Sequence, residues 1–145
     1  MRPKEYLSQA QRLRRRYESA LEELEYIRTM ADGVGAIRYD KDRVQASPVN
    51  DRLADYMIRL ERAESRVLHA AETYFTAYED ISGKIKEITP GLYADVLYLR
   101  YIRGRQLMAV ADELNYSYEY IKHIHGLALV QFGKRFPEVL KDDTQ

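Results

Sequence analysis

The chain has 145 residues, 46% of them hydrophobic, a size that suits one ordinary domain or a small domain with an extended element. It contains no cysteine, which excludes disulfide scaffolds and cysteine-based zinc sites. Its 23 basic and 23 acidic residues give zero net charge, which argues against strong sequence-independent binding to nucleic acid, because lysine and arginine supply most of that affinity.

Residues 3–30 are predicted to form a long helix. Its apolar residues recur in alternating steps of four and three, at Tyr6, Ala10, Leu13, Tyr17, Ala20, Leu24 and Ile27. This is a heptad seam of about three repeats, typical of a coiled coil. The cluster Arg12–Arg16 lies beside the seam. It could contact phosphate, but we favour a solvated face that pairs with the glutamates that follow it.

Residues 31–50 are predicted to form a loop, and residues 50–88 a second, longer helix that Asn50 or Asp51 caps. The loop is long for a compact domain, which suggests a functional or mobile segment. The second helix again has an apolar seam with steps of three and four. The first helix is too short to cover this seam completely, so a second copy of the chain is expected to cover the rest.

Thr89-Pro90-Gly91 marks the clearest boundary in the sequence. No segment has the period-two pattern of a strand, so the predicted class is all-α. We expect residues 1–89 to form a coiled-coil-like helical hairpin, for oligomerisation or partner contact. Residues 90–145 are expected to form a helix-turn-helix domain.

The helix-turn-helix prediction depends on residues 107–129. Four apolar residues have helical spacing in a short helix from Leu107 to Leu114: Leu107, Val110, Ala111 and Leu114. Asn115 suits the left-handed turn that follows, and Ser117 is a natural N-cap for the next helix. Small Ala111 lies where the two helices would cross, and Val110 and Leu114 are expected to face Ile121 and Ile124. A preceding helical segment around Leu97 is expected to end at Gly104.

The candidate DNA-binding residues follow from this arrangement. Early outward residues of a recognition helix meet base edges in the major groove. These residues are Ser117, Tyr118, Glu119, Lys122 and His123. Arg100, Arg103 and Arg105 precede the motif and are expected to contact the DNA backbone. Of Tyr118 and Tyr120, one is expected to pack under the turn, because residues two apart cannot share a helix face.

The run LYLRYIRGRQLMAVADELNYSYEYIKHIHGLAL resembles region four of bacterial sigma factors and the sigma-like domains of phage regulators. The matching positions are Leu97, Leu99, Arg100, Tyr101, Val110–Leu114, Ser117, Ile121, His125, Ala128 and Leu129. The resemblance covers roughly the last third of the chain. With a helical hairpin before it, the chain is similar to phage regulators of the ArpU type. Two departures are Asn115, at the usual turn glycine, and Gly126, where a basic residue is common.

The resemblance implies a sequence-specific transcriptional regulator of a phage or prophage, acting at late-gene promoters in the bacterial cytoplasm. Its expected partners are double-stranded DNA and a second copy of the chain, with RNA polymerase as a further candidate. One alternative is a DNA-packaging subunit like the small terminases, although these usually place the DNA-binding part first. Another is a protein-interaction module on a helical stalk, which would suit the neutral charge.

Catalytic signatures are not found in this sequence. His123 and His125 are two positions apart on a predicted helix, so they point in different directions and cannot chelate one ion together. The carboxylates alternate with basic residues, as on a solvated face. We therefore expect no enzyme activity, no cofactor and no metal site. No apolar run approaches the length of a membrane span, so no membrane partner is expected either.

Overall fold

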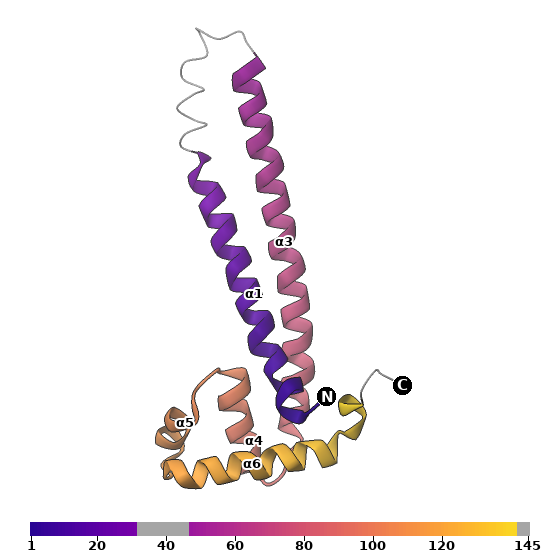
Figure 1. Cartoon of the computed structure of the whole chain (residues 1–145), viewed down its shortest axis with the longest axis vertical. Coiled ribbons are helices and arrows are strands. Elements are labelled where there is room, and N and C mark those ends of the chain that lie inside the picture. The colour runs from indigo at the N-terminus through magenta and orange to yellow at the C-terminus, as the bar shows by residue number, and fades with distance from the viewer. Residues whose placement is uncertain (32–46, 142–145) are drawn as a thin grey trace. The chain divides into compact units, whose positions relative to one another are not determined.

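The computed structural model describes residues 1–31 and 47–141. Within these ranges it contains helices and no strand, which confirms the predicted all-α class (Figure 1). The elements are α1 (Pro3–Thr29), α3 (Ser47–Lys86), α4 (Gly91–Leu97), the π-helical η2 (Tyr98–Ile102), α5 (Leu107–Leu114), α6 (Tyr118–Arg135) and the 3-10 helix η3 (Pro137–Leu140). None of these helices combines the length and apolarity needed to cross a membrane. Most of the predicted loop at 31–50 lies outside the described residues.

The chain divides into two compact units. The first unit contains residues 1–14 and 74–145, and the second contains residues 15–73. The ends of both long helices therefore belong to the same unit as α4, α5 and α6. The boundary predicted between residues 89 and 90 lies inside the first unit, because the core of that unit uses side chains from α1 and α3.

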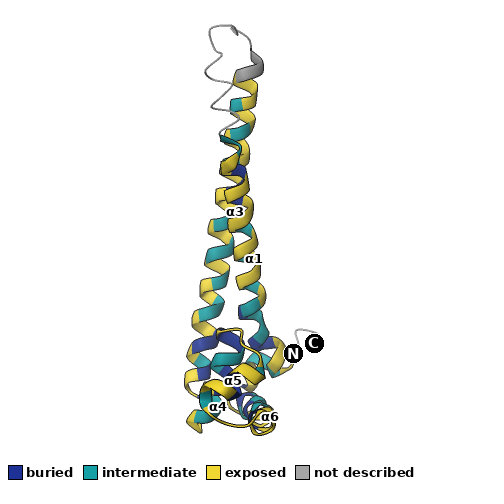
Figure 2. Ribbon diagram, turned by 90° about the vertical axis from the view of Figure 1, so that its left-hand side faces the viewer, coloured by how far each residue is buried: buried dark blue, intermediate teal, exposed yellow. Residues whose placement is uncertain are grey.

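The described residues of the second unit form two helical segments, which pack together along the predicted seam. Leu24 and Ile27 of α1 are buried against Ala63 of α3, and Tyr56, Leu60 and Val67 pack partly buried around them. An ion pair of 3.0 Å joins Arg66 to Glu23 on the surface. Most of the other described residues of this unit are exposed to solvent (Figure 2). It includes large apolar side chains: Leu21, Tyr26, Met57, Ile58 and Leu68.

The main core of the first unit joins α1, α3, α6 and the segment from α4 to η2. Its buried residues are Tyr6, Leu7, Ala10, Ile81, Ile85, Ile88, Leu97, Tyr101, Ile102, Ala128, Phe132 and Phe136. Leu7 and Ile85 lie beside the predicted heptad seams, yet they are 0% and 1% exposed. In this unit each long helix therefore buries more of its surface than the contact between the two long helices alone would bury, because other elements also pack against it.

Polar contacts also fix α1 within the first unit. The side-chain amide of Gln11 donates to the carbonyl oxygens of Tyr101 and Ile102, at 3.2 and 2.8 Å. Gly104 lies beside this amide with φ of +73°, and a Cβ there would come within 2.8 Å of Gln11 Oε1. A larger residue at this position would therefore strain the backbone and would displace the end of the Gln11 side chain. The sequence predicted the helix end at Gly104 but not the close approach of Gln11.

Candidate nucleic-acid interface

The helix-turn-helix forms from α5, a short turn and α6, with the predicted boundaries of α5 confirmed. Asn115 adopts the left-handed conformation, with φ of 62° and ψ of 42°. The Ser117 side chain accepts a hydrogen bond from the backbone N–H of Tyr120 at 3.1 Å, as an N-cap does. Both turn residues therefore act as the sequence predicted.

A small apolar core holds the two helices at their crossing. Val110 and Ala111 of α5 are buried with Ile121 and Ile124 of α6, together with Val96 from α4. Ala111 is 2% exposed, so its small side chain does lie between the helices. The predicted register of the helix-turn-helix is confirmed by these contacts.

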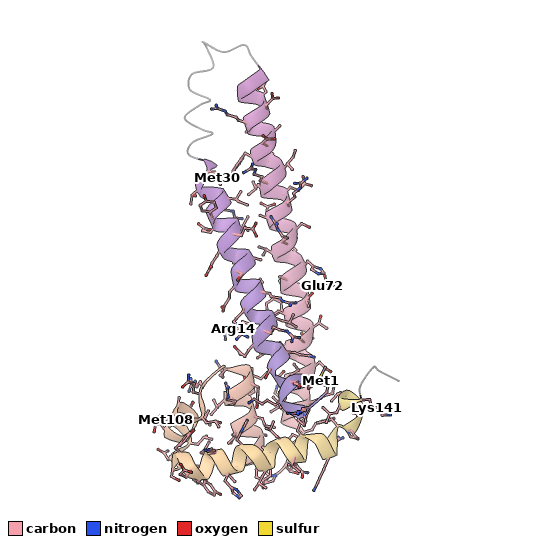
Figure 3. The ribbon with its side chains drawn as sticks, in the orientation of Figure 1. Met1, Arg14, Met30, Glu72, Met108 and Lys141 are labelled. Atoms are coloured by element: carbon pink, nitrogen blue, oxygen red, sulfur yellow. The ribbon has the colours of Figure 1, made fainter. Side chains whose placement is uncertain are left out.

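The outer side of α6 presents the predicted reading residues to solvent. Tyr118, Glu119, Lys122 and His123 are all exposed, whereas Ile121 between them is fully buried. Side chains project along the edge of α6 that faces away from α4 (Figure 3). Lys122 has no hydrogen bond or ion pair with any residue in the described part of the chain. Its ammonium group can therefore reach an anionic partner without first breaking an internal contact.

The three tyrosines around the turn are all exposed. Tyr116, Tyr118 and Tyr120 have exposed fractions of 46%, 40% and 42%. The expectation that Tyr118 or Tyr120 packs under the turn is therefore wrong. The rings of Tyr116 and Tyr120 instead contact each other, with centroids 5.0 Å apart. The turn thus carries an aromatic surface that the spacing alone did not predict.

The three arginines before the motif are engaged with neighbouring groups. Arg105 forms an ion pair with Glu113 of α5. Arg100 lies over the ring of Tyr101, and its guanidinium also donates to the carbonyl of Arg105 at 3.4 Å. Arg103 lies over the ring of Tyr98. These contacts orient the arginines on the protein surface, and a phosphate contact by Arg105 would have to replace its pairing with Glu113.

His125 has a structural role that sequence analysis did not identify. Its ring stacks on that of Tyr101, and its Nε2 lies 2.7 Å from the Tyr101 hydroxyl. Burial, followed by the nearby charges of Arg100 and Lys4, lowers the pKa of His125 below its ordinary value of 6.5. Burial raises the pKa of Tyr101 to about 12. At neutral pH both groups are therefore uncharged and share one hydrogen bond across the interface of η2 and α6.

The lowered pKa of His125 makes stability depend on pH. The unfolded chain takes up a proton near pH 6.5, whereas the folded chain resists it to lower pH, so the free energy of unfolding falls as pH falls below 6.5. We expect His125→Gln, which can keep a hydrogen bond to Tyr101, to reduce this fall between pH 7 and pH 5. Urea unfolding at several pH values measures the effect. Exposed His123→Gln should behave like the wild type, and identical pH profiles for both variants would contradict the assignment.

Among the described residues no group of three or more histidine, aspartate and glutamate side chains is placed to hold a metal ion. No protein-family model, curated protein or solved structure matches this chain. The resemblance to sigma region four and to ArpU-type regulators therefore stays a prediction from the sequence motif. The geometry of α5, the turn and α6 is the remaining guide to function.

Proposed function

We propose that this chain is a sequence-specific DNA-binding transcriptional regulator whose C-terminal helix-turn-helix reads duplex DNA. The single observation that carries the proposal is the outer face of α6, where Tyr118, Glu119, Lys122 and His123 are exposed within two turns of the Ser117 cap. A recognition helix contacts base edges with early outward residues of this kind. The sigma-like motif further favours phage or prophage late-gene promoters as targets, with RNA polymerase as a second partner.

Charge supports this assignment only locally. Between residues 92 and 136 six basic residues exceed four acidic ones, a local excess of two positive charges. Lys122 is the only lysine or arginine in the first two turns of α6, so it is the side chain best placed to contact phosphate or a guanine edge. The modest local charge favours a protein that depends on specific contacts more than on general attraction to phosphate.

The long helices support a second part of the proposal, self-association. Within the second unit Leu68 is 71% exposed, Met57 is 52% exposed and Tyr26 is 65% exposed. Exposed apolar side chains of this size on a pair of long helices favour a partner that covers them. We propose that this surface joins copies of the chain. A symmetric dimer would then bind half-sites separated by one helical turn of DNA or a multiple of it.

The DNA-binding proposal can be tested without knowing the target site. The full chain is first used to select duplexes from a random-sequence pool, and binding is then titrated on an enriched duplex and on a scrambled one. We expect Lys122→Ala to weaken binding to the enriched duplex by roughly 1–3 kcal/mol if Lys122 contacts a base. Lys86→Ala, a substitution on α3 outside the helix-turn-helix, should leave that affinity unchanged.

Salt dependence separates base contacts from backbone contacts in the same assay. Arg105→Ala should weaken binding to both duplexes alike and reduce the slope of affinity against salt concentration, because it removes a phosphate contact. Failure of the wild-type chain to enrich any duplex would contradict the proposal. So would equal affinities of wild type and Lys122→Ala for the two duplexes.

A specific observation favours one alternative, a protein-interaction module. Leu127 and Val130 on the outer side of α6 are 39% and 55% exposed, although an interface with DNA is usually polar. A protein partner would bury these side chains. This alternative gains support if selection from the duplex pool fails while the chain remains folded.

A further inference from the structure

The outer face of α6 continues past the reading residues as a stripe along the whole helix. Six exposed residues with helical spacing form this stripe: Glu119, His123, Gly126, Leu127, Val130 and Lys134. The stripe lies opposite the buried side of α6, which contains Ile121, Ala128 and Phe132. Its centre is apolar and its two ends carry opposite charges. We call it the outer stripe of α6.

Gly126 leaves an opening at the centre of the outer stripe. A Cβ built at this position meets no atom within 4 Å, so no neighbouring group in the described chain requires glycine here. Its φ is not in the left-handed region either. A glycine inside a helix makes that helix less stable than an alanine would. Such a position is suited to the close approach of another backbone or of a large side chain.

The charges at the ends of the stripe are placed symmetrically about this opening. Glu119 lies seven positions before Gly126, and Lys134 lies seven positions after Leu127. Neither charged side chain has a hydrogen bond or ion pair within the residues that the structure describes. A helix that binds this face is therefore best matched when its own charges run in the opposite order.

The face of α6 itself meets that requirement when it is turned by a twofold axis. We propose that the outer stripe of α6 pairs with the same stripe of a second copy of this chain, antiparallel, with the axis between Gly126 and Leu127. Each Leu127 then enters the opening at the other copy's Gly126. Each Glu119 lies opposite Lys134 at both ends of the pair, as an isologous interface demands.

Parallel pairing has none of these advantages. It would place Glu119 beside Glu119, Lys134 beside Lys134, and Leu127 beside Leu127, so like charges would repel and the opening at Gly126 would stay empty. The sequence of α6 therefore selects one orientation. Pairing of this kind would cover Glu119 and His123, and it would compete with binding of duplex DNA. This last consequence rests on the proposed function, whereas the pairing itself does not.

Cysteine crosslinking tests the orientation directly, because the chain has no cysteine of its own. In the antiparallel pair His123 of one copy lies opposite Val130 of the other. The two His123 residues are separated by seven positions, about 10 Å along the helix axis, and so are the two Val130 residues. The full chain is made as His123→Cys and as Val130→Cys, one of them with an affinity tag. The two are mixed without DNA and oxidised. We expect disulfides between one His123→Cys chain and one Val130→Cys chain to form in preference to disulfides between two copies of the same variant.

Gly83→Cys provides the background rate, since Gly83 is also exposed, helical and open to solvent. Mixed crosslinking no faster than this background would overturn the proposal. Preferential crosslinking of each variant with itself would overturn the antiparallel orientation. Circular dichroism on each variant checks that the helical fold is retained. Because DNA is absent, failure here leaves the DNA-binding proposal standing, and failure of duplex selection leaves the pairing intact.

A charge exchange tests the pairing of Glu119 with Lys134 in the same crosslinking assay. Glu119→Lys alone, or Lys134→Glu alone, places like charges opposite each other at both ends. We expect either to slow mixed crosslinking by about three- to tenfold, in keeping with the small energies of exposed ion pairs. The double exchange should restore the original rate. A double variant as slow as the single variants would overturn the proposed pairing.

Discussion

A fragment containing only residues 90–145 is expected to be largely unfolded. In the full chain the side chains of Tyr101 and Phe132 are buried against Tyr6, Leu7 and other residues of the two long helices. Removing those helices exposes this face to water and leaves about 56 residues, a length at which burial of apolar surface is already marginal. Circular dichroism, thermal melting and the dispersion of amide signals in NMR spectra measure the outcome.

A matched control keeps the core and removes the remainder of the long helices. Residues 15–73 are replaced by a flexible linker, so that residues 1–14 and 74–145 remain in one chain. We expect this shortened chain to unfold cooperatively, because it retains all residues of the main core. Cooperative melting of the fragment 90–145, with dispersed amide signals, would mean that the long helices are not required by the helix-turn-helix.

Replacing Phe132 by alanine is expected to cause the largest loss among single substitutions in α6. Its ring is fully buried and lies 5.8 Å from that of Tyr6 and 5.1 Å from that of Phe136, measured between centroids. Truncation leaves a cavity among three helical elements, and such a change typically lowers the free energy of unfolding by about 3–5 kcal/mol. Chemical denaturation of the full chain at equilibrium measures the free energy of unfolding.

The same substitution at an exposed site provides the comparison. Phe75 of α3 belongs to the same unit and is 52% exposed, so Phe75→Ala removes the same atoms with less burial. We expect a much smaller loss of stability than for Phe132→Ala. Equal losses for the two variants would show that α6 is not anchored through Phe132.

Local sequence signals predicted the helix-turn-helix accurately. The conformation of Asn115, the cap at Ser117 and the burial of Ala111 each depend on a few neighbouring residues, and all three are confirmed. The exposure of the outer residues of α6 follows from the same helical spacing. What these residues bind is not a consequence of spacing, so DNA recognition stays a prediction.

Contacts between distant segments could not be predicted in this way. Leu7 lies beside the heptad seam and was not expected in the core, because the pattern of one helix does not indicate that a third element packs on its flank. The hydrogen bond between Tyr101 and His125 and the ion pair between Arg105 and Glu113 depend likewise on the packing of separate elements. The domain boundary predicted at residue 89 was based on the pattern of each segment separately. It could not indicate that residues before and after this position share one core.

The burial of α1 against the C-terminal helices has a consequence during synthesis on the ribosome. Tyr6 and Leu7 are translated long before their partners Phe132 and Phe136. The face of the first helix that packs on Phe132 and Phe136 therefore stays uncovered until those residues have been translated. Long-range closure of this kind slows folding and prolongs exposure to aggregation. Nascent chains stalled before residue 132 should accordingly be preferred clients of ribosome-associated chaperones.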